Sequence, residues 1–165
     1  MLVTKDVLLI RQFQSGDEEA VRNLHWLALP VKTLLVDGPW DDDDLRNIRN
    51  EYLNNGGDFL VGFLRNNLVC MGALRKVSEN VGEIKLMRVH PDHQRKGFGQ
   101  LILDKLEVDA SRAGYDILRL DTNTKQCAAQ YFYKKNGYKE THRAIISFME
   151  VIFFEKSLNK PAFIR

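Results

Sequence analysis

A strand passes into a long helix at Val89-His90-Pro91-Asp92-His93-Gln94-Arg95-Lys96-Gly97-Phe98-Gly99. The first backbone amides of a helix lack intrahelical partners, and the helix dipole adds partial positive charge, so such an end binds phosphate groups. Gly97 and Gly99 leave room for a pyrophosphate. Each glycine weakens a helix by about 1 kcal/mol relative to alanine, so two of them in one first turn indicate a local use. Arg95 and Lys96 supply charge that a pyrophosphate would neutralise. The stretch predicts a phosphate loop, with an ordinary helix start as the alternative.

Two helices follow a first strand in the N-terminal third of the chain. Branched apolar residues predict the strand over residues 7–13, and Ser15-Gly16-Asp17-Glu18 fits a capping box at the start of a helix that Pro30 ends. After a loop over residues 31–40, the acidic run 41–44 favours a second helix start, because carboxylates complement the helix dipole. The expected buried face of this second helix consists of Leu45, Ile48, Tyr52 and Leu53.

Six further strands and two helices complete the predicted order. Residues 59–64 and 68–74 predict a hairpin joined across residues 65–67, and the strand 82–89 leads into the phosphate loop. Beyond the long helix, which Gly114 ends, we expect the strand 117–120, the helix 125–136, and the strands 138–141 and 148–155. The order β-α-α-β-β-β-α-β-α-β-β predicts an α/β fold with a mixed sheet and helices on its faces, in a single domain over residues 1–165.

Composition argues against several classes of function. The 165 residues carry a net charge of +2 from 24 basic and 22 acidic side chains, so no nucleic-acid or membrane partner is expected. Residues 1–6 lack the pattern of a signal peptide, and we expect a cytoplasmic protein with Cys70 and Cys127 as reduced core or near-core thiols. His90 and His93 flank Asp92 without further ligands at metal spacing, so no metal is expected.

Two motifs make the phosphate loop more specific than its glycines alone. Gln94-Arg95-Lys96-Gly97-Phe98-Gly99 matches the Q/R-x-x-G-x-G/A signature of the GNAT superfamily of N-acetyltransferases, and residues 87–91 resemble the strand that leads into it. Downstream, residues 129–138 are similar to that family's A-x-x-x-Y-x-x-x-G-F/Y helix end. The element order agrees from Val7 to Glu155, so nearly the whole chain resembles a GNAT-like acyl-CoA N-acyltransferase fold.

This resemblance implies acetyl-CoA (coenzyme A) as the co-substrate and assigns residues to it. The pyrophosphate would lie on the backbone amides of six residues, Gln94, Arg95, Lys96, Gly97, Phe98 and Gly99. Main-chain groups of Met87 and Val89 would pair with the pantetheine arm as an additional strand would. This pairing requires their strand to splay from the strand 117–120.

The second motif implies further contacts. Tyr133 matches a tyrosine that approaches the thioester sulfur in many relatives and protonates the departing thiolate, and Ala129 begins the motif on the cofactor side. Many relatives carry asparagine seven residues before this tyrosine, where this chain has Gln126, and Asn123 is the alternative donor. Lys135 is expected either near the 3′-phosphate or simply in solvent.

Glu83 is the expected general base for the amine, acting directly or through ordered water. It stands six residues before Val89, where many relatives carry a catalytic glutamate. Regular alternation would place Glu83 on the same strand face as Met87 and Val89. The alternative role is a structural ion pair with Lys85. A backbone amide near Val89 would meet the oxyanion.

The sequence leaves the acceptor open. Neither cysteine has an activating partner, so we expect direct transfer in a ternary complex rather than an acetyl-cysteine intermediate. In relatives the first two helices and the last strands line the acceptor pocket, and here these segments supply Trp26, Thr33, Trp40, Tyr52, residues 41–44 and residues 148–154. Trp40 beside the aspartates suits an amine by cation–π contact, or it covers the edge of the core. A small amine, an amino acid and a protein or peptide amine stay open as acceptors, as does a homodimer through the last strands.

Two other classes of protein compete with an N-acetyltransferase. A non-catalytic acyl-CoA-binding or regulatory module would keep the phosphate loop without the chemistry. A generic nucleotide-binding protein would use the same glycines for ATP or NAD. The chain lacks a Walker lysine after the glycines and a third Rossmann glycine in register, which argues against the nucleotide-binding class.

Overall fold

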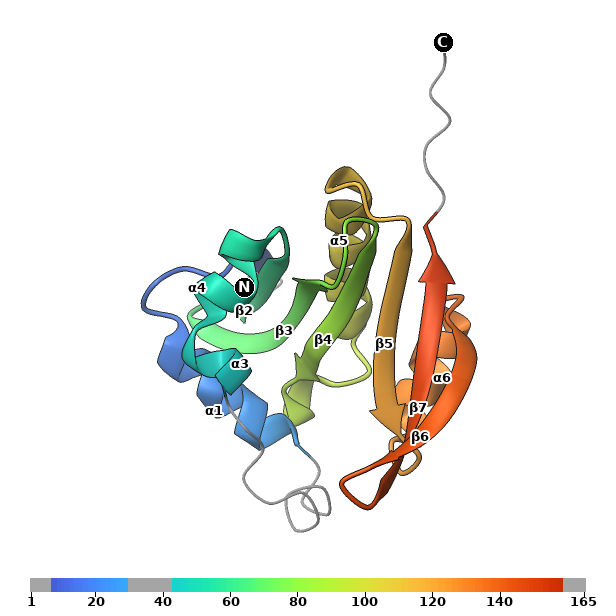
Figure 1. Ribbon diagram of the computed structural model, residues 1–165. Helices are drawn as coiled ribbons and strands as arrows, with labels where there is room; N and C mark the ends of the chain where they lie inside the picture. Colours follow the sequence, from blue (N-terminus) through green and yellow to red (C-terminus); the bar gives the residue numbers. More distant parts are fainter. Residues whose placement is uncertain (1–6, 30–42, 159–165) are drawn as a thin grey trace.

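Seven strands form one sheet in the order β1-β2-β3-β4-β5-β7-β6 (Figure 1). The computed structural model of the protein describes residues 7–29 and 43–158. The strands are β1 Leu8–Gln12, β2 Asp58–Leu64, β3 Asn67–Lys76, β4 Val81–Val89, β5 Ile117–Asn123, β6 Lys139–Ile146 and β7 Met149–Ser157. β4 and β5 are parallel, and every other neighbouring pair is antiparallel. The predicted α/β fold with a mixed sheet is confirmed.

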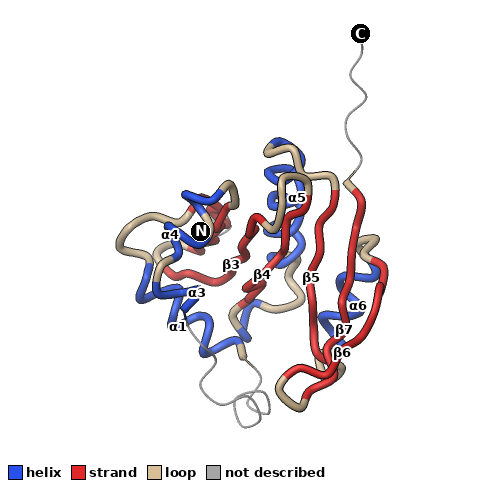
Figure 2. Tube along the Cα trace, in the orientation of Figure 1, coloured by secondary structure: helices blue, strands red, loops and turns tan. Residues whose placement is uncertain are grey.

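Helices cover both faces of the sheet (Figures 1 and 2). The helices and 3-10 turns are α1 Glu18–Ala28, α3 Asp43–Arg46, α4 Ile48–Glu51, η1 Leu53–Asn55, η2 Pro91–His93, α5 Phe98–Arg112 and α6 Cys127–Lys135. α1, α3 and α4 lie on one face, and α5 and α6 lie on the other. None of the helices in the described ranges is long and apolar enough to cross a membrane.

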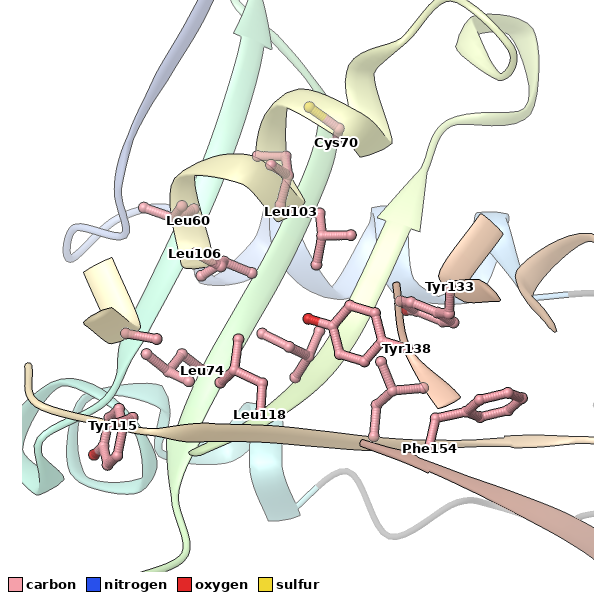
Figure 3. Packing of buried hydrophobic residues seen from close by; sticks show 14 of the residues in the cluster. Leu60, Cys70, Leu74, Leu103, Leu106, Tyr115, Leu118, Tyr133, Tyr138 and Phe154 are labelled. Carbon is pink, nitrogen blue, oxygen red and sulfur yellow. The ribbon is translucent and has the colours of Figure 1, made fainter. Parts of the chain in front are cut away.

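The core between the sheet and α5 fixes the helix whose start carries the phosphate loop (Figure 3). Ile102, Leu103, Leu106 and Ala110 recur at helical spacing and are fully buried. Burying a leucine or isoleucine side chain contributes about 1.5–3 kcal/mol. α6 extends the same cluster through Tyr133, so the helices of both motifs rest on one core.

A second cluster fills the opposite face of the sheet. Val21 and Leu24 of α1 pack with Phe59 of β2, Met71 of β3 and the buried ring of Tyr52. This packing holds α1 against β3 and β4. The N-terminal helix therefore forms one boundary of the space in front of β4.

β4 and β5 separate towards their C-terminal ends (Figure 1). Their pairing stops at Glu83 with Arg119, although β4 continues to Val89 and β5 to Asn123. β5 is thus longer than the predicted strand 117–120, and its last residues pair with β7 on one edge and face an opening on the β4 edge. The splay that the pantetheine prediction requires is present.

A bulge in β4 changes which of its side chains share a face. Leu86 has a φ of 53°, and the register with β3 shifts beside it. Ile84 and Met87 consequently pack in the same cluster against α5, which places Glu83 on the opposite face. The prediction that Glu83 shares a face with Met87 and Val89 is wrong, because the bulge interrupts the alternation between them.

The predicted second helix is broken into single turns. Asn47 separates α3 from α4 with φ −140° and ψ 55°, and its side-chain oxygen accepts a backbone amide three residues later. Such a side-chain hydrogen bond competes with continuation of a helix. Leu45, Ile48 and Tyr52 are buried as expected, whereas Leu53 is only half-buried.

The start of α1 also differs from the prediction. The N-cap is Asp17 rather than Ser15, and the Asp17 carboxylate binds Arg11 at 2.6 and 2.9 Å without capping the helix. Glu18 does reach back to the amide of Gly16, at 2.7 Å. The predicted capping box is wrong, because the strand residue Arg11 takes the carboxylate at the cap position.

The two cysteines lie in different environments. Cys70 is buried, and burial raises the pKa of its thiol to about 12. Cys127 is exposed in the first turn of α6. The prediction of a core or near-core thiol is right for Cys70 and wrong for Cys127, because α6 packs through a different face that includes Ala129 and Tyr133.

Candidate functional site

Polar groups of the phosphate loop hold its shape. The Nδ1 atom of His90 accepts a hydrogen bond from the amide of Asp92 at 3.2 Å. The side-chain amide of Gln94 donates to the carbonyl of Val89 at 3.3 Å, and Lys96 Nζ donates to the carbonyl of Asp92 at 2.9 Å. These bonds connect the end of β4, the 3-10 turn and the start of α5, so the loop is preformed.

A run of backbone amides in this loop has no protein acceptor. The first bond that closes a turn of α5 joins the amide of Leu101 to the carbonyl of Gly97, at 3.1 Å. Within the described part of the chain, the amides of residues 95–100 donate to no protein group. A Cβ at Gly97 would meet no atom within 4 Å, and one at Gly99 would meet only Val89 Cγ2, at 3.5 Å. Free amides in open space at the positive end of a helix dipole suit a pyrophosphate.

Two loop residues adopt left-handed backbone conformations. Arg95 has φ 61° and Gly97 has φ 86°. Two left-handed residues on either side of Lys96 make a tight backbone turn, and successive amides in such a turn form an anion-binding concavity. Glycine adopts this conformation without the steric cost that a Cβ would bring. The side chains of Arg95 and Lys96 are exposed beside this concavity.

Tyr133 of α6 packs in the core cluster between the helices and the sheet. Its buried ring packs edge-on against Phe132 and Tyr138, with centroids 5.2 and 5.6 Å away. Burial raises the pKa of Tyr133, Arg88 of β4 opposes this rise, and Asp121 of β5 adds to it. Because charges on both strands act on the same hydroxyl, that hydroxyl is close to the opening, and it keeps its proton through the neutral pH range.

The other residues predicted from the second motif surround α6. Gln126 is its N-cap, and the amide of Gln126 donates to the carbonyl of Asn123 at 3.1 Å. The side-chain oxygen of Asn123 accepts the amide of Lys125 at 3.0 Å, whereas the side chain of Gln126 makes no hydrogen bond to any residue that the structure describes. Ala129 is half-buried against the core, and Lys135 is exposed in the last turn. The side-chain amide nitrogens of Gln126 and Asn123 thus both have no acceptor among the described residues.

Glu83 is buried in an ion-pair network on the α1 face of β4. Its Oε2 atom accepts from Nη2 and Nε of Arg75 at 2.5 and 3.1 Å, and its Oε1 atom lies 3.4 Å from Nε of Arg119. Lys85, the expected ion-pair partner, binds Asp44 instead, at 2.6 Å. The carboxylate of Glu83 is thus held in place by arginines of the two neighbouring strands.

The structure adds three polar residues that sequence reasoning missed: His25, Arg88 and Asp121. Asp121 lies on β5 beyond its last pair with β4. Desolvation of its carboxyl raises the pKa of Asp121, and the negative charge of Glu83 raises it further. Lys85, Arg119 and Arg75 oppose that rise. The sequence does show charged residues, Arg88 and Asp121, inside otherwise apolar strands. It does not show on which face of the sheet each side chain lies.

His25 gives the folded protein a pH-dependent stability. Burial, followed by the charge of Arg88, lowers the pKa of His25 to about 4. The unfolded chain titrates near 6.5, so between these values it binds a proton that the folded state excludes, and stability falls as the pH falls. From neutral pH to about pH 4, we expect the unfolding free energy to drop about 3 kcal/mol more than in His25→Gln. Urea unfolding across this pH range measures the difference, and parallel pH curves for both proteins would contradict the assignment.

The structure describes only some of the residues that were predicted to line the acceptor pocket. Four of the named residues lie outside the described ranges: Thr33, Trp40, Asp41 and Asp42. Trp26 lies on the surface of α1, and the Tyr52 hydroxyl donates to Asp44 at 3.2 Å from within the core. At the other end Phe148 is exposed at the β6–β7 turn, whereas Phe154 is fully buried. Tyr52 and Phe154 thus belong to the core, and Trp26 and Phe148 to the surface.

The sequence profile of the acetyltransferase (GNAT) family matches residues 18–138, which span both motifs and the splayed strands. The chain belongs to the GNAT family. GNAT is a family of acetyl-CoA-dependent N-acetyltransferases. The phosphate loop at the start of α5 is thus the part of a GNAT domain where coenzyme A is expected.

Two curated GNAT relatives match part of the chain. The aminoalkylphosphonate N-acetyltransferase of Salmonella typhimurium is 36% identical over 62 residues, which is 38% of this chain and 40% of the relative. YsnE of Bacillus subtilis, an uncharacterised N-acetyltransferase, is 33% identical over 70 residues, which is 41% of this chain and 46% of the relative. The chain spans less than half the length of these relatives.

Solved structures match almost all of this GNAT chain. A GNAT acetyltransferase from Staphylococcus aureus Mu50 has a TM-score of 0.82 and 26% identity, covering 93% of this chain and 100% of that one. An acetyltransferase from Streptococcus agalactiae 2603 has a TM-score of 0.83 at 19% identity, covering 92% and 98%. The Salmonella typhimurium protein yncA, solved with its cofactor acetyl-CoA, has a TM-score of 0.75 at 18% identity, covering 94% and 96%. The last two show likeness of fold alone.

Proposed function

We propose that this GNAT protein transfers an acetyl group from acetyl-CoA to a primary amine by direct transfer in a ternary complex. The observation that carries the proposal is the run of free amides over residues 95–100, beside the opening between β4 and β5. These amides would hold the pyrophosphate. The unpaired edge of β4 at Met87 and Val89 would hold the pantetheine arm, which directs the thioester into the opening.

Direct transfer needs a proton acceptor for the amine and a proton donor for the sulfur. The amine nitrogen attacks the thioester carbonyl carbon, the carbon–sulfur bond breaks, and the sulfur leaves as a thiolate. Arg75 and Arg119 fix the position of the Glu83 carboxylate. We assign Glu83 as the group that accepts the proton of the amine through an ordered water. Tyr133 gives its phenolic proton to the thiolate. Exchange with solvent then removes the proton from Glu83 and returns one to Tyr133. Burial raises the pKa of Cys70 to about 12, which disfavours a cysteine nucleophile there.

Glu83→Gln tests the assignment of the base. We expect kcat/KM for the amine to fall about 100-fold near neutral pH. The loss should shrink above about pH 9, because more of the acceptor is then unprotonated without help. Initial rates of coenzyme A release between about pH 6 and about pH 10 measure this profile.

Glu79→Gln is the matched control for Glu83→Gln, because Glu79 is exposed and, among the residues that the structure describes, pairs with Lys76 alone. It should change neither the rate nor its pH profile. A purely structural role for Glu83 predicts a lower Tm and a small loss of rate that is the same at every pH. That outcome would remove Glu83 as the base.

An assay of coenzyme A release tests the proposed activity as a whole. The protein is incubated with acetyl-CoA and a panel of amino acids, polyamines, peptides with free N-termini and aminoalkylphosphonates. The last class is included because the Salmonella relative is named for it, and the partial match does not carry that acceptor to this chain. Amine-dependent release, with the acetylated product identified by mass spectrometry, supports the proposal. Tight binding of acetyl-CoA without turnover across the panel favours the non-catalytic acyl-CoA-binding module.

A further inference from the structure

Arg88 is a charged side chain in the wall of the opening between β4 and β5. It follows the last pair of these strands, Glu83 with Arg119, so no strand covers that edge of β4. Across the β3–β4 ladder its partner is Met71, which packs in the cluster beneath α1. The guanidinium therefore projects on the α1 face, which is also the face of Glu83.

This guanidinium has few partners. Nη1 donates to the carbonyl of Met87 at 2.9 Å. Nε is out of contact with solvent and has no hydrogen-bond partner within residues 7–29 and 43–158. Two carboxylates on the same face of the sheet, Asp44 and Glu83, are bound to other cations, at 2.6 Å to Lys85 and at 2.5 Å to Arg75. A buried cation in this state is unfavourable unless an anion joins it.

The charge of Arg88 affects the pKa of one side chain on each of two helices, α1 and α6. After burial itself, Arg88 is the next cause that lowers the pKa of His25 on α1. The same guanidinium opposes the burial that raises the pKa of Tyr133 on α6. α1 and α6 cover opposite faces of the sheet (Figure 1), and Arg88 stands on the stretch of β4 that has no partner on β5, so its charge reaches both helices. An acceptor must enter this space to reach a thioester beside Tyr133.

We propose that Arg88 binds an oxyanion of the acceptor, so that the acceptor is a primary amine that also carries a carboxylate or a phosphonate. This inference rests on the proposed acetyltransferase function and names the substrate class of the same site. A planar guanidinium can donate two parallel hydrogen bonds to such an oxyanion. Glu83 and Arg88 offer opposite charges on one face of β4, which matches the two ends of a zwitterionic acceptor. A polyamine has no anionic end, and Arg88 repels it.

A matched series of acceptors tests the anion site. β-Alanine, 2-aminoethylphosphonate and ethanolamine present one aminoethyl group with a carboxylate, a phosphonate or a hydroxyl, and L-alanine with L-alaninamide forms a second pair. We expect kcat/KM to be at least about 50-fold higher for the anionic members. The carboxylate and phosphonate arms distinguish which oxyanion the site prefers.

Arg88→Met should abolish this preference, mainly by raising KM for the anionic acceptors, while the Kd of acetyl-CoA stays within about twofold. Arg88→Lys should restore part of the preference, because it keeps the charge without the planar fork. Arg112→Met is the control, since Arg112 is exposed at the far end of α5. Thermal unfolding of each variant verifies that it folds.

Failure of this inference and failure of the proposed function give different results. Turnover that favours ethanolamine, L-alaninamide or a polyamine, and that Arg88→Met leaves unchanged, overturns the anion site and keeps the enzyme. If no amine is acetylated, the proposed function fails. Direct measurement of anion binding to the protein then tests whether Arg88 forms an anion site. Calorimetric titration of the coenzyme A-loaded protein with propionate and with ethylphosphonate then supports it if Arg88→Met loses the binding. Absence of binding to the unmodified protein overturns it.

Discussion

Replacing Gly97 with glutamate is expected to raise the Kd of coenzyme A by at least about 100-fold. Gly97 has φ 86°, where a residue with a side chain costs about 1–2 kcal/mol. The new carboxylate would also stand among the free amides that we assign to the pyrophosphate, and it would compete with and repel that group. A Cβ at this position meets no protein atom within 4 Å, so repulsion of the ligand is the larger of the two effects.

Two further variants separate these effects. Gly114→Glu is the matched control, because Gly114 has φ 94° and equally open surroundings at the opposite end of α5. It should lose stability as Gly97→Glu does and keep its affinity for coenzyme A. Gly97→Ala adds the backbone strain without the charge and should weaken binding only a few-fold. Calorimetry with coenzyme A and the Tm of each variant provide the measurements; unchanged affinity in Gly97→Glu would place the pyrophosphate elsewhere.

The phosphate loop could be predicted from the sequence because its signal is local. Gly97 is the N-cap of α5, and the helix ends at Arg112 shortly before Gly114, as the pattern indicated. The conformation of a helix end is decided by residues within a few positions of it, through free amides, caps and left-handed glycines. A single sequence contains all of that information.

The helix starts at α1 and α4 show where local signals fail. Asp17 and Asn47 are good capping residues by type, but the Asp17 carboxylate binds Arg11 of β1 and the Asn47 side chain ends one turn to begin another. The first outcome depends on the arrival of a strand residue, which is a tertiary event. The second depends on competition between two hydrogen bonds of similar strength, which residue type alone does not decide.

The composition of the opening could not be predicted for a different reason. Leu86 is a non-glycine residue with positive φ, and no propensity favours leucine there. With regular alternation, Arg88 would have pointed into the core beneath α5, on the face opposite Glu83. The bulge brings both side chains to the acceptor face. The residues to which we assign the acceptor are therefore brought to one face by an irregularity in β4 and not by its sequence pattern.

Tyr133→Phe is expected to lower kcat about 100-fold while the Kd of acetyl-CoA changes by less than about twofold. The phenylalanine ring keeps the packing against Phe132 and Tyr138, so α6 retains its place. The pKa of Tyr133 is raised, so its phenol carries a proton throughout the neutral range, and this proton is present for donation as negative charge develops on the departing sulfur. Its hydroxyl makes no hydrogen bond to the described residues, so removing it should change the unfolding free energy little.

Tyr131→Phe is the matched control for this prediction, because Tyr131 lies on the same helix with 71% of its surface exposed. Each variant loses one phenolic hydroxyl, at positions two residues apart on α6, and at equal Tm their difference in rate isolates the proton of Tyr133. Product release can limit kcat, so the rate is also measured in single turnovers with enzyme in excess over acetyl-CoA. A single-turnover rate of Tyr133→Phe equal to that of the unmodified protein would mean that the thiolate leaves without this proton. The proton would then have to come from water in the opening between β4 and β5, and Tyr133 would be a packing residue.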